Sequence, residues 1–156
     1  MAKKFLTSSS WQIVFVVAFI LCFVFLSFWN QRAPRSQEFV LKGEPVDLYV
    51  AKTLKDTYRG LGKRDDLDGK DGMLFLFEYA GKHGIVMRDM RFPLDIVWLD
   101  AGKVVDIVEN APVQPGATES ELVVYKPALD ATMILELPAG WVRAHGLEVG
   151  DVLTNA

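Results

Sequence analysis

The N-terminal part of the chain contains an apolar run from Trp11 to Trp29 that no charged residue interrupts. With a rise of about 1.5 Å per residue, a helix of this length spans roughly 28 Å, which is close to the hydrocarbon thickness of a bilayer. A helix satisfies its own backbone hydrogen bonds, and indole rings at both ends favour the two membrane interfaces. The run is apolar on every face, which argues against a helix in a soluble core. The sequence therefore predicts a transmembrane helix over residues 11–29.

A cleaved signal peptide is the alternative interpretation of this segment, because the residues Met1–Lys4 form a short basic start. Signal peptides have a shorter apolar core of roughly 7–15 residues, with small residues before the cleavage site. Here Phe28 and Trp29 stand where small residues are needed, and Cys22 lacks a small neighbour that would indicate a lipid-modified cysteine. We therefore expect an uncleaved single-pass anchor in the inner or plasma membrane. Residues 1–10 would form a short cytoplasmic tail, and the soluble part would lie in the periplasm or at the cell exterior.

The rest of the chain divides into a polar linker over residues 30–45 and one soluble domain over residues 46–153. From residue 36 onward the chain carries 13 Lys and Arg against 20 Asp and Glu. Phosphate contacts need a basic surface, so an acidic domain of this kind is not expected to bind nucleic acid. The sole cysteine, Cys22, lies in the predicted anchor, so no intrachain disulfide supports the domain.

Short strand-like segments separated by turns dominate the soluble part. The pattern predicts strands near residues 46–50, 73–77, 83–88, 94–99, 104–108, 122–125 and 131–137, a turn at 78–82 and a hairpin turn at 100–103. It also predicts short helices over residues 53–61 and 141–145, with Thr53 as an N-cap and Gly146 as a C-terminal stop. We therefore expect a mostly β fold, a compact β-sandwich or barrel-like domain with two short helices, preceded by one N-terminal transmembrane helix.

Several short motifs follow one another through this domain. They are Arg59-Gly60-Leu61-Gly62, the run from Asp71 to Phe77, Met87-Arg88, the run from Pro93 to Asp100, Glu109-Asn110-Ala111-Pro112, the run from Leu135 to Gly140, and Gly150-Asp151. With these motifs, in this order, the region from about residue 46 to 153 resembles the prokaryotic family catalogued as domain of unknown function 192. The resemblance implies a compact, mostly β fold that often follows a signal or an anchor. It implies no established activity.

The chain departs from the pattern of that family on both sides of Met87. The family usually has a Phe-Trp pair before this methionine, where the chain has Ile85 and Val86. It usually has Lys-Asn-Thr after the methionine, where the chain has Arg88-Asp89-Met90. If the aromatic pair stacks on a ligand in other members, this chain lacks that stack.

The residue inventory argues against the common catalytic and metal sites. The soluble part has no cysteine, its serines Ser36 and Ser120 lie outside any Gly-x-Ser-x-Gly motif, and no Gly-x-Gly-x-x-Gly loop is present. The two histidines, His83 and His145, have no partner at the spacing of zinc ligands. The acidic loop over residues 65–71 departs from the EF-hand spacing, because a lysine occupies a ligand position, so a solvated loop is preferred to a calcium site. We expect no catalytic residue, no metal and no cofactor.

Two carboxyl groups stand out because each lies in a strongly apolar strand. Asp95 and Glu136 must find hydrogen-bond donors or shift their pKa, since an unpaired buried charge is costly. In a functional interpretation they join Met87 and Arg88 at the mouth of a pocket that recognises a hydroxyl-rich or cationic ligand. In a structural interpretation they form a buried ion pair or cap loop amides. The sequence leaves both interpretations open.

Three functions from different classes follow from these residues. A module that binds a small molecule or an envelope polymer through Met87, Arg88, Asp95 and Glu136 ranks first. A protein-interaction or scaffolding domain with an unidentified partner ranks second. A hydrolase or lyase that uses Asp95 and Glu136 as acid and base ranks last, because the chain offers no activated nucleophile and no metal set.

Overall fold

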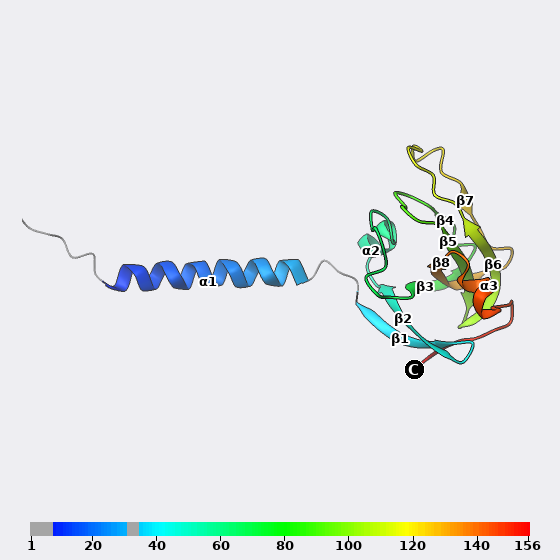
Figure 1. Cartoon of the computed structure of the whole chain (residues 1–156), viewed down its shortest axis with the longest axis horizontal. Coiled ribbons are helices and arrows are strands. Elements are labelled where there is room, and N and C mark those ends of the chain that lie inside the picture. Colours follow the sequence, from blue (N-terminus) through cyan, green and yellow to red (C-terminus); the bar gives the residue numbers. More distant parts are fainter. Residues whose placement is uncertain (1–7, 31–34) are drawn as a thin grey trace, which may run out of the picture. The chain divides into compact units, whose positions relative to one another are not determined.

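The computed structural model describes residues 8–30 and 35–156, with side chains for residues 11–26 and 35–156 (Figure 1). The chain divides into two units, residues 1–33 and residues 34–156. In the first unit, helix α1 (Ser8–Asn30) covers the helix predicted over residues 11–29, and its side chains from Trp11 to Leu26 are exposed. When only the described residues are counted, no helix is both long enough and apolar enough to cross a membrane. Residues 1–7 of the predicted tail and residues 31–34 of the predicted linker lie outside the described residues.

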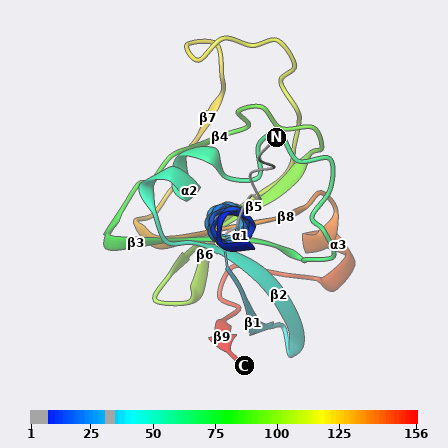
Figure 2. The same ribbon diagram turned by 90° about the vertical axis from the view of Figure 1, so that its left-hand side faces the viewer.

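The second unit is a mostly β domain built on one seven-stranded sheet (Figures 1 and 2). Its strands are β1 (Ser36–Leu41), β2 (Glu44–Ala51), β3 (Gly72–Gly81), β5 (Leu94–Asp100), β6 (Lys103–Ala111), β8 (Ala131–Pro138) and β9 (Leu153–Asn155), in the order β6-β5-β8-β3-β2-β1-β9. Strands β2 and β3 are parallel, and the other neighbours are antiparallel. A small second sheet pairs β4 (Ile85–Val86) with β7 (Val124–Tyr125), and the domain adds helices α2 (Leu54–Arg59) and α3 (Trp141–His145).

The seven-stranded sheet curls so that the start of β6 meets the residues just before β9. Lys103 at the start of β6 forms an isolated bridge with Val152, the residue before β9. The amide of Leu153 donates a hydrogen bond to the carbonyl of Gly102 at 2.8 Å, and the amide of Val104 donates one to the carbonyl of Asp151 at 2.8 Å. The predicted mostly β class is thus confirmed, and the architecture is a curled half-barrel rather than a sandwich of two large sheets.

Both faces of the central strands are buried, each in its own apolar cluster. The inner cluster draws on all seven strands and includes Leu74, Val97 and Leu135, together with apolar residues of α3 and the segment after it. The outer cluster lies on the opposite face and is covered by the segments around α2 and β4. Alternation along each strand assigns successive residues to the two clusters. Trp98 belongs to the outer cluster, is fully buried and donates its indole N–H to the carbonyl of His83 at 3.0 Å.

Two elements differ from the sequence-based expectation. The predicted linker over residues 30–45 contains strand β1, whose residues Phe39 and Leu41 are buried inside the curl while its first residues are polar and exposed. The domain therefore starts before residue 46. The predicted turn over residues 78–82 is instead the far half of β3, which continues to Gly81 with a shift of register against β8 after Leu76.

The two predicted capping residues of the short helices, Thr53 and Gly146, are confirmed, whereas α2 ends at Arg59 instead of residue 61. Thr53 is the N-cap of α2, and its hydroxyl accepts a hydrogen bond from the amide of Asp56 at 3.1 Å. Gly146 ends α3 in the left-handed region, with φ of 60°. Helix α2 also stops at a glycine, Gly60, whose φ is 52°. This sharp stop places the end of α2 over the outer face of the sheet, where the candidate site lies.

Candidate functional site

The two candidate carboxyl groups lie on opposite faces of the sheet. Strands β5 and β8 pair so that Asp95 is opposite Leu137 and the next residue, Ile96, is opposite Glu136. Because side chains alternate between faces, Asp95 points toward the inner cluster, as Val97 does, and Glu136 points toward the outer cluster. Asp95 and Glu136 therefore do not face one cavity, as the acid and the base of a hydrolase or lyase would.

Asp95 has a structural role. It is fully buried, and its two carboxyl oxygens accept hydrogen bonds from the amide of Asn110 at 2.8 Å and from the amide of Val142 at 2.9 Å. Val142 lies in the first turn of α3, whose N-cap Gly140 offers no side-chain hydrogen bond. Asp95 thus caps this helix from a neighbouring strand and fixes the end of β6, where Asn110 adopts a positive φ of 54°.

Glu136 has no such partners. The residue is 4% exposed, and its Oε2 atom has no hydrogen-bond partner among the residues that the structure describes. The strand residues paired with it, Met73 and Ile96, are both apolar. Burial raises the pKa of Glu136 from 4.5 to about 8. The group is therefore largely protonated at neutral pH and offers a hydrogen-bond donor for which the described residues supply no acceptor.

This carboxyl lines a cavity of about 230 Å³ beneath helix α2. The cavity lies between the end of α2, strand β4 and the outer face of β3 and β8, with walls from Phe75, Ile85, Val86 and Met90. Gly60 keeps the space beside the carboxyl open, since a Cβ atom there would lie 3.9 Å from Oε2 of Glu136.

Arg88 lines the same cavity but is bound to other groups. Its Nε donates to Oε2 of Glu119 at 2.8 Å, its Nη2 donates to Oε1 of the same residue, and its Nη1 donates to the carbonyl of Tyr58 at 3.0 Å. The guanidinium also lies over the ring of Tyr58, 4.1 Å from its centroid. The hydrogen bonding between Arg88 and Glu119 lowers the pKa of Glu119 and raises the pKa of Arg88. Arg88 is therefore not the counterion of Glu136.

The structure brings together part of the predicted binding set and adds residues to it. Glu136 and Arg88 share the cavity, whereas Asp95 lies on the other face and Met87 is buried in the outer cluster without lining the cavity. Arg59 joins the site at the end of α2. Its side chain is exposed and makes no hydrogen bond or ion pair with the described residues. The motif Arg59-Gly60-Leu61-Gly62 was the signal in the sequence that could have placed α2 at the site.

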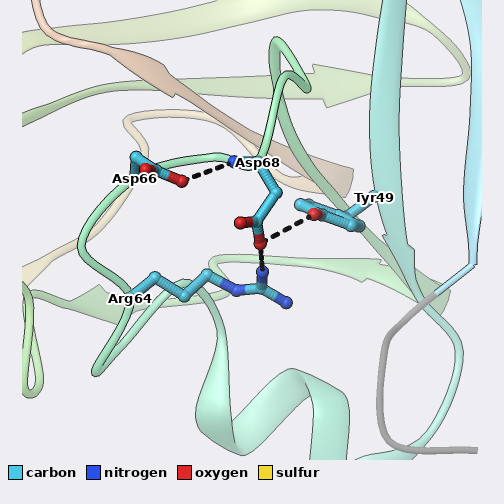
Figure 3. A network of polar contacts seen from close by, with 4 residues as sticks. All are labelled: Tyr49, Arg64, Asp66 and Asp68. Atoms are coloured by element: carbon cyan, nitrogen blue, oxygen red, sulfur yellow. Dashed lines mark hydrogen bonds and ion pairs between the residues drawn. The ribbon is translucent and has the colours of Figure 1, made fainter. Parts of the chain in front are cut away.

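The acidic loop after α2 is organised by an arginine (Figure 3). Arg64 donates to Asp68 at 3.0 Å and lies over the ring of Tyr49, 4.5 Å from its centroid. The carboxyl of Asp66 accepts a hydrogen bond from the amide of Asp68 at 2.8 Å. Protein donors thus engage these carboxyl groups. Within the described parts of the chain, no three His, Cys, Asp or Glu side chains are grouped so that they could hold a metal ion.

A family model described as "DUF192: Uncharacterized ACR" matches residues 38–155. The chain belongs to the DUF192 family. This confirms the resemblance seen in the sequence, and the match begins within strand β1. No curated protein matches the chain.

Two crystal structures share the fold of this DUF192 domain. One comes from Sinorhizobium meliloti 1021 and is described as a "putative transcription regulator"; it is 26% identical, with 78% of this chain and 94% of that chain covered and a TM-score of 0.66. The other is a protein of unknown function from Novosphingobium aromaticivorans DSM 12444, which is 22% identical, with 77% of this chain and 85% of that chain covered and a TM-score of 0.66.

The structural role of Asp95 predicts a large loss of stability in Asp95→Asn. The amide group would place its NH₂ against one of the two backbone N–H groups, which leaves a buried donor without an acceptor. We expect the free energy of unfolding to fall by about 2–3 kcal/mol in chemical denaturation. Asp100→Asn is the matched control, because Asp100 is exposed on the same strand and accepts one hydrogen bond, from Thr132. Equal effects of the two substitutions would contradict the assignment.

The raised pKa of Glu136 predicts a pH-dependent stability with a defined sign. Between about pH 4.5 and 8 the folded protein keeps a proton that the unfolded chain releases. The contribution of Glu136 to the stability is therefore greatest at the acidic end of this window and falls as the pH rises, by up to about 1.4 kcal/mol per pH unit. Glu136→Gln removes this contribution, so denaturation curves of the two proteins should diverge across the window. Parallel pH profiles would show that Glu136 titrates normally.

Proposed function

We propose that the DUF192 domain of this chain is a binding module for a small ligand, which occupies the cavity beneath α2. The observation that carries this proposal is the carboxyl of Glu136, which is buried in the cavity wall and has no partner in the described part of the chain. Leaving a buried polar group unsatisfied costs free energy, and such groups are rare outside sites where something else completes them. A ligand that accepts or shares the proton of Glu136 would remove that cost.

The size of the cavity limits what the ligand can be. Its volume of about 230 Å³ lies below the roughly 300–1,000 Å³ that is typical of pockets for drug-sized ligands. A molecule of the size of a short organic acid, an amino acid or one sugar unit fits this volume. An envelope polymer could place only an end group or a side group in the cavity. The two carboxyl groups on opposite faces give no support to a carboxylate-pair enzyme.

We also propose that helix α1 anchors the domain in a membrane, with the domain outside the cytoplasm. The support lies in the described apolar side chains of α1, which are exposed from residue 13 to residue 26, and in the sequence, where the apolar run continues to Trp29. Exposed apolar side chains over such a length need an apolar environment. A regulator that binds DNA directly is not proposed, because the domain is acidic.

A protein-interaction role is the second candidate, and one surface favours it. Leu54 is 92% exposed at the start of α2, and Tyr79 is 72% exposed on β3. Both residues line a hollow of about 610 Å³ between α2 and the far half of β3. Such exposed apolar and aromatic residues are common in interfaces.

The binding proposal predicts stabilisation that depends on Glu136. In a thermal-shift screen of amino acids, monosaccharides and short organic acids, at least one class should raise the Tm of the full chain by a few degrees at saturating concentration. Glu136→Leu should abolish this shift, because it removes the polar group in the cavity. Glu38→Gln is the control, because Glu38 is exposed on β1, far along the sheet from β8. A screen without any hit, or the same shift in Glu136→Leu, would refute a ligand at this cavity.

The anchor proposal predicts that the full chain stays in the membrane fraction after washing with alkaline carbonate and is released by detergent. Protease added to intact spheroplasts should remove the domain. A chain without residues 1–30 should be recovered in the soluble fraction. Recovery of the full-length protein without detergent, or full protection from the protease, would contradict the proposed anchor or its orientation.

A further inference from the structure

The charges around the cavity indicate which class of small molecule it accepts. Two arginines, Arg59 and Arg88, line the cavity, and one acidic side chain, Glu136, lies in its wall. Arg88 is neutralised by its two hydrogen bonds to Glu119. Arg59 makes no ion pair with the described residues. A protonated Glu136 is neutral, so the cavity carries an uncompensated positive charge.

We propose that the cavity binds a small organic anion, with the carboxyl O–H of Glu136 donating a hydrogen bond to an oxygen of the ligand and Arg59 compensating the negative charge. This inference rests on the proposed function, because it requires that the cavity hold a ligand. The apolar walls at Phe75, Ile85 and Val86 contact the carbon skeleton, so a short carboxylate matches the site better than an inorganic ion.

A cationic ligand fits the same cavity less well. It would have to pass or displace Arg59, and it would need the ionised form of Glu136, which burial among apolar residues disfavours. It would gain one ion pair at the cost of placing a second cation beside the exposed guanidinium. An anion meets complementary groups on both sides, a donor on the sheet and a cation at the end of α2.

Given the groups that surround Glu136, we expect its protonation to be the main cause of any pH dependence of ligand binding. The flanking strands face it with Met73 and Ile96, which do not titrate. Helix α2 contributes Tyr58 and Arg59, and the segment after β4 contributes Arg88. His83 does not line the cavity; its ring stacks on that of Phe77 with centroids 3.8 Å apart, and its Nε2 lies 2.9 Å from the carbonyl oxygen of Tyr79. Asp89, also after β4, pairs with Lys63 at 3.4 Å.

The test compares three probes of one shape but different charge: butyrate, butyramide and butylammonium. Their dissociation constants are measured by calorimetry on the full chain in a nonionic detergent between pH 6 and 9.5. We expect butyrate to bind most tightly, with an affinity that falls about tenfold per pH unit once Glu136 ionises, because only the protonated form is competent. Glu136→Gln keeps a donor but cannot ionise, so butyrate binding should become independent of pH in this range.

A pair of charge-matched variants identifies the cation. Arg59→Gln should weaken butyrate binding roughly threefold to tenfold at every pH. Lys55→Gln should leave it unchanged, because Lys55 lies on the same helix and is exposed but does not line the cavity. Circular dichroism of each variant confirms that it is folded.

The remaining outcomes separate the two proposals. Tighter binding of butylammonium than of butyrate, increasing with pH and lost in Glu136→Leu, would overturn the anion inference but leave the cavity as a binding site. Equal binding of butyrate by all variants would overturn the assignment of Glu136 and Arg59. Failure of all three probes, together with a screen that yields no hit, would overturn both proposals.

Discussion

The need to bury both faces of the central strands governs the rest of this domain. Strands β3, β8 and β5 lie in the middle of a curled sheet, so one face packs inside the curl while the other would be exposed without a cover. The segments around α2 and β4 supply that cover. The cover is incomplete where α2 ends at Gly60, and the space left there is the cavity that contains Glu136. The candidate site is thus a consequence of how a single sheet is covered on its outer face.

The curl itself depends on a few backbone hydrogen bonds between segments at opposite edges of the sheet. The turn at Ala101 and Gly102, both with positive φ, brings the start of β6 against the residues before β9. Asp95 adds a second constraint, because it holds the end of β6 and the first turn of α3 at once. These contacts fix the inner cluster, on which the outer cluster and its cavity are supported.

Much of the fold could be predicted because alternation and turn residues are local signals. The runs around Val97 and Leu135, the cap at Thr53 and the stop at Gly146 all have the predicted structure. Strand β1 could not be predicted in the same way, since its polar first residues look like a linker and only pairing with β2 and β9 makes it a strand. The candidate site was harder to predict from the sequence than strand β1. Asp95 and Glu136 look alike in sequence, and their difference arises from which loop amides approach each face of the sheet.

The structure shows where this chain departs from the usual DUF192 pattern. Ile85 and Val86, which stand where the family usually has Phe-Trp, line the cavity beside Glu136. Aliphatic side chains contact a ligand through dispersion alone and offer no ring face for stacking on a sugar or a base. In the proposed binding site, selectivity therefore has to come from the polar groups, the carboxyl in the sheet and the guanidinium at the end of α2. This is why the protonation state of Glu136, rather than an aromatic platform, is expected to decide what this cavity accepts.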